Sequence, residues 1–313
     1  MYPTITNIYR KDIFTIRGLK IMDIYSYVIK TSERFDESDL YFGHGTENSL
    51  DEAAYLVCGS LNISYDCDLQ SLNYFLSSED IELIEERIQR RIKEKIPTAY
   101  LVGKAMFAGF EFIVDERALI PRSPIAELIL NGFSTLMTRE PQRVLDLCAG
   151  NGCIGISIAK IYSESLVDLL DCDENCLKLA QANIAKHNLL DQVNVINSNL
   201  FEKVTEKYDL IVSNPPYVSS KEYESLPIEY FHEPKGGLVC GESGLSIPAK
   251  ILQEAKDYLS EKGLLVLELG HSKSSLEKRF PLVPFLWIEF SHGGHGVLAI
   301  TREQLTEYCN ELN

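Results

Sequence analysis

An asparagine, two prolines and a tyrosine stand directly after a short apolar run. Residues 208–213 (YDLIVS) read as a buried strand, and the residues that follow are Asn214, Pro215, Pro216 and Tyr217. Proline stiffens the chain and has no N–H group to compete for nearby acceptors. The asparagine side chain adds an amide oxygen that can accept a hydrogen bond. These four residues therefore predict a rigid polar loop that could bind a ligand.

Such a loop suits methyl transfer to a planar nitrogen. The lone pair of an amide or exocyclic amine is delocalised into its π system, so this nitrogen is a poor nucleophile. The Asn214 side-chain oxygen and the Pro215 carbonyl can accept its two N–H groups, and Tyr217 can pack on the flat group and exclude water. Positioning of this kind can supply up to roughly 7–11 kcal/mol. We predict that Asn214, Pro215, Pro216 and Tyr217 are catalytic; a plain Pro-Pro turn with a capping asparagine is the alternative.

A glycine-rich turn precedes this loop in the sequence. Gly150, Gly152 and Gly155 form a G-x-G-x-x-G array after the apolar run 143–148. Glycine allows positive φ and close approach of the backbone to a ligand. Asp171 ends the next predicted strand, where a carboxylate can accept from both ribose hydroxyls. These features fit NAD, S-adenosylmethionine or a tight turn, and the N-P-P-Y loop favours S-adenosylmethionine because hydride transfer has no use for it.

From about residue 140 onward, predicted strands and helices alternate. This pattern is typical of a parallel α/β sheet with helices on both faces, which binds ligands at the carboxyl ends of its strands. The predicted strands are 143–148, 165–171, 192–198, 208–214, 264–269, 283–290 and 296–302. The predicted helices are 151–162, 173–188 and 246–263, the last of them ended by Gly263.

The first part of the chain has a different pattern. Apolar residues at helical spacing predict helices over 22–35, 49–61 and 77–97, with Ser77 or Ser78 as the cap of the third. Residues 105–116 change to aromatic and β-branched residues, which predicts a hairpin with Gly109 at its turn. We predict three parts: a helical substrate-recognition domain, a linker with a β-hairpin, and a catalytic domain. Their bounds are 1–95, 96–120 and 121–313.

Charge limits the class of partner. The 313 residues carry a net charge of −16, and residues 31–86 hold 14 acidic side chains and one basic one, Arg34. A phosphate-backbone binder needs a basic footprint, so we predict no direct sequence-specific binding of nucleic acid. The acidic region is either a solubilising face or a docking surface for a basic protein. No run approaches the roughly 18–20 apolar residues of a membrane span, and the N-terminus shows no export signal, so a cytoplasmic location is expected.

The cysteines do not suggest a metal site. None of the eight forms a C-x-x-C pair, and without an export signal we expect reduced thiols. Zinc sites usually combine a closely spaced pair with a second pair elsewhere, which the pairs Cys148/Cys153 and Cys172/Cys176 do not provide. We predict no metal.

Several motifs together resemble a known family. The segments DLCAGNGCIG, NPPY and the acid Asp171 are similar to class I S-adenosylmethionine-dependent methyltransferases that modify glutamine or adenine amino nitrogens. Residues 99–128 resemble the segment that precedes the core of the protein glutamine N5-methyltransferases. The segment IPRSPIAEL, together with 41–53, 226–234 and 289–305, is similar to the group that acts on large-subunit ribosomal protein three rather than on release factors. The resemblance implies a Rossmann-like, mostly parallel seven-stranded sheet and a basic ribosomal protein as substrate.

The resemblance also implies roles for single residues. Asp171 would contact the ribose of the donor, and Asn214 to Tyr217 would bind the target glutamine. Asn214 is also expected among the residues that contact the donor. Asn199 stands where the family usually has an aspartate for the adenine amino group, which predicts weaker donor binding. The donor's methionine part would contact the loop of Cys148, Ala149, Gly150, Asn151 and Gly152.

Other polar residues and other functions remain open. His232 reads as a structural loop histidine, and Arg122 could reach a carboxylate of a ligand or form an internal salt bridge. The alternative functions are release-factor glutamine methylation, adenine-N6 methylation of nucleic acid, and an inactive binding factor that retains the fold.

Overall fold

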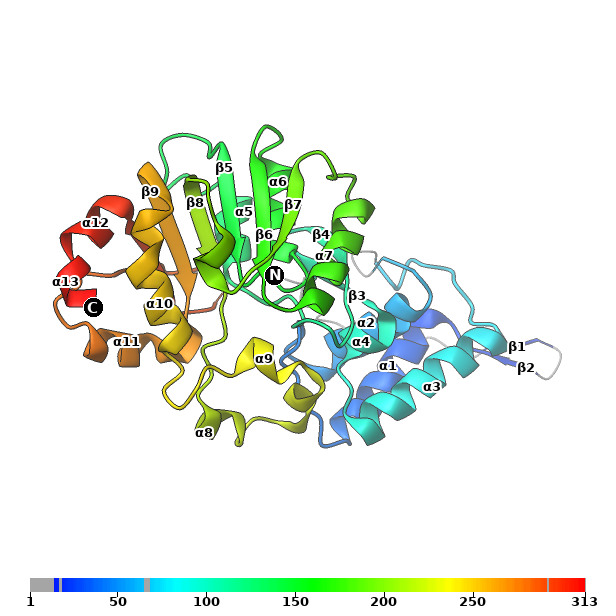
Figure 1. Ribbon diagram of the computed structural model, residues 1–313. Coiled ribbons are helices and arrows are strands. Elements are labelled where there is room, and N and C mark those ends of the chain that lie inside the picture. The colour runs from blue at the N-terminus through cyan, green and yellow to red at the C-terminus, as the bar shows by residue number, and fades with distance from the viewer. Residues whose placement is uncertain (1–13, 17–18, 65–67, 292, 313) are drawn as a thin grey trace. The chain divides into compact units, whose positions relative to one another are not determined.

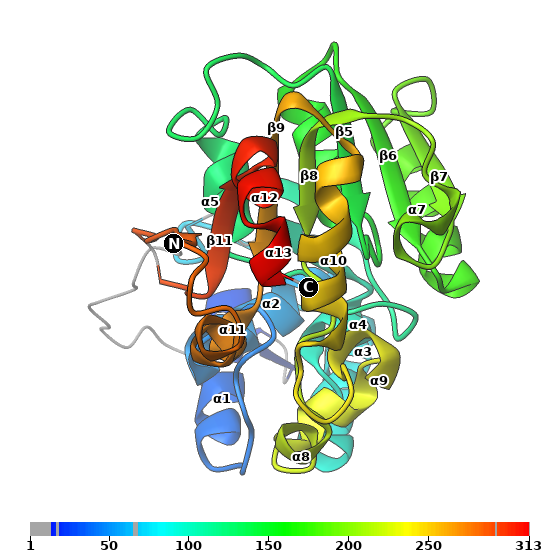
Figure 2. The same ribbon diagram turned by 60° about the vertical axis from the view of Figure 1, so that its left-hand side comes forward.

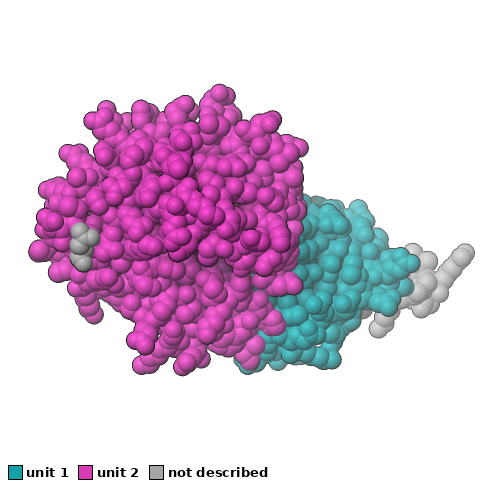
Figure 3. Space-filling model, in the orientation of Figure 1, with its two compact units in different colours: residues 1–104 teal, residues 105–313 magenta. Residues whose placement is uncertain are grey.

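The computed structural model describes residues 14–16, 19–64, 68–291 and 293–312. The chain divides into two compact units, Met1–Lys104 and Ala105–Asn313 (Figure 3). This division falls inside the predicted linker 96–120, and the assignment of a recognition role to the first unit stays a prediction. Among the described residues, none of the helices has the length and apolar character that a bilayer crossing requires.

Unit 1 is mainly helical, and each helix predicted in it is present. Ser77 caps the longest helix: its hydroxyl accepts from the Asp80 N–H, and the Asp80 side chain accepts from the Ser77 N–H. The helix ends where Lys95 adopts a left-handed conformation, two residues before Pro97. The elements are β1 (Phe14–Ile16), β2 (Leu19–Ile21), α1 (Ile24–Asp36), α2 (Ser49–Ser60), α3 (Ser78–Glu94) and α4 (Thr98–Val102).

A buried ion pair lies within the apolar core of this unit. Most of the core residues come from α1, α2 and α3, among them Phe35, Leu56 and Ile84. Between them Arg91 Nε donates to Glu52 Oε1 at 2.7 Å, with side-chain exposures of 1% and 4%. Each buried charge is therefore compensated by its partner.

The predicted hairpin leads into unit 2. β3 (Lys104–Phe107) and β4 (Phe110–Ile113) are joined by Ala108 and Gly109, whose φ angles are 48° and 80°. Two positive φ values in a two-residue loop match the turn that the twist of a hairpin favours. The prediction of Gly109 at this turn is confirmed.

A seven-stranded sheet forms the centre of unit 2 (Figures 1 and 2), as the resemblance implied. The strand order is β10-β11-β9-β8-β5-β6-β7; the five strands from β9 to β7 are parallel, and β11 runs antiparallel to both of its neighbours, β9 and β10. The strands are β5 (Arg143–Leu147), β6 (Leu166–Asp171), β7 (Val193–Asn197), β8 (Tyr208–Ser213), β9 (Leu259–Glu268), β10 (Leu286–Trp287) and β11 (Val297–Thr301). The α-helices are α5 (Ile125–Leu130), α6 (Cys153–Ile161), α7 (Glu174–Lys186), α8 (Ser220–Tyr223), α9 (Lys235–Leu238), α10 (Ser246–Glu254), α11 (Lys273–Arg279), α12 (Arg302–Glu307) and α13 (Cys309–Leu312). Short 3₁₀ turns are η1 (Leu200–Lys203), η2 (Ile228–His232), η3 (Ala255–Asp257) and η4 (Gly270–Ser272).

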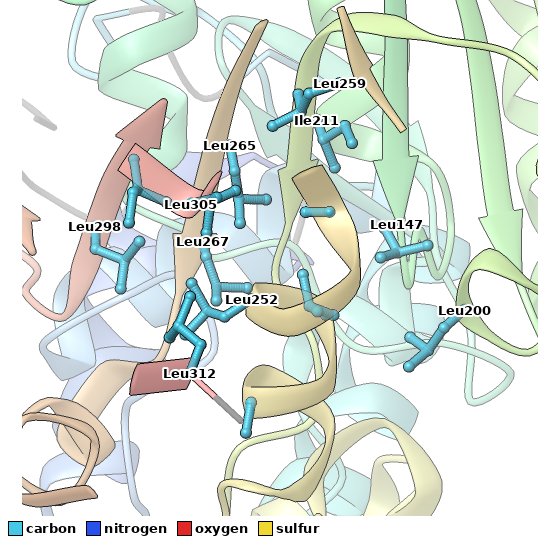
Figure 4. Packing of buried hydrophobic residues seen from close by; sticks show 14 of the residues in the cluster. Leu147, Leu200, Ile211, Leu252, Leu259, Leu265, Leu267, Leu298, Leu305 and Leu312 are labelled. Atoms are coloured by element: carbon cyan, nitrogen blue, oxygen red, sulfur yellow. The ribbon is translucent and has the colours of Figure 1, made fainter. Parts of the chain in front are cut away.

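Alternate residues of the strands supply the main core. Leu147, Ile211, Leu265 and Leu298 project to the face covered by α10 and α12, where Leu252 packs among them (Figure 4). The intervening residues face α6 and α7. The sheet is therefore buried on both sides, which explains why its strands are nearly continuous apolar runs.

One predicted helix is shorter than expected. The prediction 246–263 is wrong beyond Glu254, because β9 already begins at Leu259 and contains Gly263. Leu259 pairs with Tyr208 of β8, and a Cβ at Gly263 would lie 2.9 Å from the Tyr208 carbonyl oxygen. Strand pairing outweighs the local helical pattern here, and the glycine permits a close backbone contact rather than ending a helix.

Candidate active site

The polar residues singled out in the sequence meet at one edge of the sheet. Leu147 of β5 lies opposite Leu170 of β6 and Ser213 of β8, so these parallel strands end in register. Chain order reverses between β5 and β8, and such a switch point is where open α/β sheets bind ligands. The residues that follow or end the neighbouring strands, in spatial order from β9 to β6, are Glu268, Asn214, Cys148 and Asp171.

The turn after β5 adopts the strained backbone that its sequence predicts. Cys148, Gly150 and Gly152 have φ angles of 63°, 56° and 80°, in the left-handed region that favours glycine. Gly155, one turn into α6, has a different role: a Cβ there would lie 2.3 Å from Leu169. The first three residues shape a turn, whereas Gly155 lets α6 pack tightly on the sheet.

Asp171 helps to hold this turn. Its Oδ2 accepts from the Gly150 N–H at 2.9 Å, and its Oδ1 accepts from the Asp173 N–H at 3.0 Å. Burial raises the pKa of this half-buried carboxyl, although these backbone donors oppose the shift. Each carboxylate oxygen can accept more than one hydrogen bond, so Asp171 can hold the turn and still accept from a ligand.

Two buried polar atoms near the turn have no partner among the described residues. They are Oδ1 of Asp146 and Nδ2 of Asn151, while Asp146 Oδ2 accepts from the Gly155 N–H at 2.8 Å. Burial raises the pKa of Asp146 to about 7. Native structures rarely leave such atoms unpaired. Together with the left-handed turn and Asp171, this arrangement fits a polar nucleotide-like donor such as S-adenosylmethionine.

Asn183 was not singled out in the sequence, yet it connects the turn to the hairpin. This fully buried residue of α7 donates to the Asn151 carbonyl at 3.0 Å and to the Ile113 carbonyl at 3.1 Å. Its side-chain oxygen accepts from the Ile113 N–H at 2.7 Å. A polar residue on the apolar face of a predicted helix was the available signal.

Asn199 lies just beyond β7 and is exposed. Its side-chain nitrogen donates to Glu202 at 2.7 Å, so the amide oxygen is the atom left to accept. The adenine-contact role assigned to it remains a prediction.

The N-P-P-Y loop leaves β8 beside the glycine turn. Ser213, the last residue of β8, donates through its hydroxyl to the Leu147 carbonyl at 2.6 Å and ties the two strand ends together. Asn214 follows half-buried, and Pro215 is buried. The structure thus brings the predicted catalytic loop and the predicted donor turn to neighbouring strand ends.

Tyr217 is held from several directions. Its hydroxyl donates to Glu268 Oε1 at 3.3 Å, and its carbonyl accepts from the Ser272 hydroxyl at 3.0 Å. A Cβ at Gly270 would lie 2.8 Å from the tyrosine ring, and one at Gly244 would lie 2.3 Å from its carbonyl oxygen. Burial and the nearby Glu268 raise the pKa of Tyr217, so the hydroxyl stays protonated.

Arg122 forms an internal salt bridge, one of the two roles open from the sequence. Its two terminal nitrogens donate to the two oxygens of Glu233 at 2.6 Å each, and Oε1 also accepts from the Ile120 N–H at 2.9 Å. Burial alone would lower the pKa of Arg122, but the Glu233 carboxylate outweighs it and raises that pKa. The guanidinium also lies over the Tyr230 ring, with its central carbon 5.3 Å from the centroid. This pair fixes the segment 228–233 to the segment before α5.

The C-terminal glycine motif, within residues 289–305, packs against the segments that surround Tyr217. A Cβ at Gly296 would lie 2.0 Å from the Gly270 carbonyl oxygen, and the Gly296 carbonyl accepts from the Leu269 N–H at 2.7 Å. A Cβ at Gly294 would lie 2.6 Å from Pro124. Two motifs far apart in the sequence, 121–128 and 289–305, therefore share one packing interface beside Tyr217.

Comparisons with known proteins agree with this geometry. Residues 126–235 match the model of the methyltransferase small domain. The chain is 40% identical over 288 residues to the ribosomal protein uL3 glutamine methyltransferase of Francisella tularensis subsp. tularensis, covering 91% of this chain and 92% of that protein. It is 41% identical over 287 residues to the enzyme of the same name from Neisseria meningitidis serogroup B, covering 91% and 94%. The chain belongs to this family of methyltransferases.

Family membership confirms the predicted fold class and the methyl donor, S-adenosylmethionine. A crystal structure of a methyltransferase from Pyrococcus furiosus is similar to this chain at 19% identity, with a TM-score of 0.45, covering 72% of this chain and 99% of that one.

Proposed function

We propose that this chain methylates the side-chain amide nitrogen of a glutamine in ribosomal protein uL3. The observation that carries the proposal is the position of Asn214, which leaves β8 in register with the donor turn after β5. The names of the two relatives support uL3 as the acceptor protein. The reaction would take place in the cytoplasm, where ribosomes assemble.

The residues of the loop would act by positioning the acceptor. The Asn214 side-chain oxygen and the Pro215 carbonyl accept the two N–H groups of the glutamine amide, which turns its lone pair toward the donor. Tyr217 covers the flat amide and excludes water. S-adenosylmethionine supplies an electrophilic methyl group when bound. Cys148, Gly150 and their neighbours would hold its methionine part.

Asp171 would accept from the ribose of the donor, and the Asn199 amide oxygen would accept from the adenine amino group. Because the methylated nitrogen becomes cationic and strongly acidic, it releases its proton without a strong base. His232 in η2 therefore needs no catalytic role.

An acidic surface of unit 1 supports a basic protein as substrate. Arg34 is the only basic residue between positions 31 and 86, and it forms a bidentate salt bridge with Glu85. Its Nη2 donates to Glu85 Oε1 at 2.6 Å and its Nη1 donates to Oε2 at 2.8 Å. Apart from Glu52, which is buried and paired with Arg91, most of the other acids lie at the surface without a compensating charge from this segment, and they would attract a basic ribosomal protein. The exposed members on α1, the loop after it and α3 are Glu33, Asp36, Glu37, Asp39, Glu47, Glu79, Glu82 and Glu86.

The function is tested by methyl transfer from labelled S-adenosylmethionine to purified uL3, to a release factor and to duplex DNA. Mass spectrometry then locates the added methyl group. Label on a glutamine of uL3 alone is expected. Label on the release factor would favour the related glutamine methyltransferase activity, and label on DNA would favour adenine-N6 methylation. Donor binding without label on any acceptor would favour a binding factor that retains the fold.

The catalytic loop is tested by Asn214→Ala. Loss of one of two acceptor groups for the glutamine amide is expected to abolish detectable transfer while calorimetry shows nearly unchanged donor affinity. Asn194→Ala is the matched control, because Asn194 is an exposed asparagine within β7. Activity of the Asn214 variant close to that of the control would remove the acceptor role.

The acidic surface is tested by replacing Glu79, Glu82 and Glu86 with glutamine. We expect a higher KM for uL3 at low salt and a smaller difference at high salt, because screening shortens the reach of surface charges to about 3 Å at 1 M salt. A matched triple variant replaces the exposed residues Glu303, Glu307 and Glu311 of unit 2. An equal effect of both triples would mean that only total charge matters.

A further inference from the structure

A carboxyl group that the proposed mechanism does not use lies against its tyrosine. Glu268 is the last residue of β9 and is 5% exposed. Its Oε1 accepts from the Tyr217 hydroxyl at 3.3 Å, and its Oε2 accepts from the Ser123 hydroxyl at 2.5 Å. The Ser123 hydroxyl in turn accepts from the Ile125 N–H at 3.2 Å, at the start of α5. One buried carboxylate thus connects three segments: the end of β9, the loop after β8 and the start of α5.

Burying a carboxylate costs free energy unless hydrogen bonds or an opposite charge compensate it. Removing a carboxylate from water without full pairing is unfavourable, and burial raises the pKa of Glu268 to about 7. Arg122 is nearby but its side chain is already engaged by Glu233. A leucine at this position would fill the same space without the cost of burying a charge, but it could not accept hydrogen bonds. The carboxylate therefore contributes through its two hydroxyl partners, Tyr217 and Ser123.

From these contacts we infer that Glu268 is a positioning residue for methyl transfer, which acts by fixing the Tyr217 ring against the bound acceptor amide. This inference rests on the proposed role of Tyr217. The ring has two further constraints, the close approach of Gly270 and the hydrogen bond from Ser272 to the tyrosine carbonyl. Those constraints hold the backbone and limit the space beside the ring, whereas Glu268 accepts the hydrogen bond that orients the hydroxyl group.

The signal in the sequence is a single acid within an apolar run. Residues 264–269 read LLVLEL, and Glu268 is the only charged residue in it. A charged side chain at the carboxyl end of a buried parallel strand points to the ligand edge of the sheet. Only the pairing register shows that this end lies beside Tyr217, because Ser213 of β8 pairs with Leu267 of β9.

The inference is tested by a double-mutant cycle with Glu268→Gln and Tyr217→Phe. Each single change is expected to lower kcat about 10-fold, with KM for the donor unchanged. If Glu268 acts through the tyrosine hydroxyl, the double variant should be no slower than the worse single variant. Independent effects that multiply to about 100-fold would overturn the inference. The acceptor in this assay is whichever protein or nucleic acid the wild-type chain methylates, so an error in the assignment of uL3 does not affect the result.

A second measurement needs no acceptor. Hydrogen exchange of the donor-bound protein is compared for the wild type, Glu268→Gln and Asp209→Asn. Asp209 is a matched control: it is a largely buried carboxylate of β8 that accepts four hydrogen bonds, near the opposite end of that strand. Faster exchange in residues 214–223 and 123–128 for Glu268→Gln alone is expected. Unchanged exchange in both segments, or equal acceleration in the Asp209 variant, would overturn the inference.

Discussion

The ion pair of Arg122 and Glu233 allows a quantitative test of how strongly the segment 228–233 is held to the segment before α5. The Glu233 side chain is completely buried, that of Arg122 is 24% exposed, and the two groups share two hydrogen bonds of 2.6 Å. Arg122→Met removes the charge and all donors while it keeps an unbranched apolar stem. The Glu233 carboxylate would then remain buried and lose both hydrogen bonds from Arg122, while the Ile120 N–H still donates to it.

The expected cost follows from this burial. Removing one partner of a buried ion pair typically costs about 3–5 kcal/mol. Because Arg122 is partly exposed, we expect about 3 kcal/mol for Arg122→Met, at the lower end of that range. Glu233→Gln keeps an acceptor for Ile120 but loses the charge, which should cost about 1.5–3 kcal/mol. The double variant removes both charges of this pair and leaves neither of them uncompensated, so its cost should fall below the sum of the two by about 1–3 kcal/mol.

The assay uses the single tryptophan. Trp287 lies in β10 of unit 2, so its fluorescence during urea unfolding reports on the unit that contains the pair. Arg117→Met is the matched control, because Arg117 forms a similar two-point contact with Asp115 but both side chains are about one-third exposed. An exposed pair contributes about 0.2–1 kcal/mol, so this control should change little.

Two outcomes would refute the reasoning. A cost below about 1 kcal/mol for Arg122→Met would place the pair among ordinary surface contacts. Fully additive costs in the double variant would show that the two side chains do not stabilise one another in solution.

Three further predictions concern stability and loop geometry. Burial raises the pKa of Asp146 to about 7, so the folded protein favours the protonated carboxyl; its contribution to stability is present at low pH and is lost as the pH rises from about 4 to 7. Asp146→Asn carries no charge at any pH and should therefore raise Tm relative to the wild type more at pH 8 than at pH 5. An equal difference in Tm at both pH values would contradict this. In unit 1, Glu52→Gln removes the carboxylate charge to which Arg91 Nε donates at 2.7 Å and should destabilise the helices by about 3–5 kcal/mol, seen as a lower urea midpoint in far-UV circular dichroism; an unchanged midpoint would argue against the pair. Gly270→Ala places a Cβ 2.8 Å from the Tyr217 ring at a φ of +48° and should reduce transfer at least 10-fold with donor affinity retained, whereas normal kcat would show that the ring can move without cost.

Much of the fold follows from local patterns in the sequence. Every predicted helix and strand of unit 2 has a counterpart, because amphipathic periodicity and apolar runs report which faces are buried. The glycine turn and the N-P-P-Y loop were also readable, since glycine and proline have conformational effects that do not depend on distant neighbours. The boundary at 246–263 failed because the pairing of Leu259 with Tyr208 is non-local.

Only the tertiary structure decides which residues, distant in the sequence, pair with one another around the N-P-P-Y loop. Arg122 and Glu233 are 111 positions apart, and Ser123 and Glu268 are 145 apart. No local pattern links such pairs. Arg122 and Ser123 precede α5, Glu233 follows η2 and only Glu268 ends a strand, so they meet because the tertiary fold brings these loops to the edge where the parallel strands end. The sequence alone thus determines the elements and the residue types at their ends, and strand order and register determine which of those residues meet.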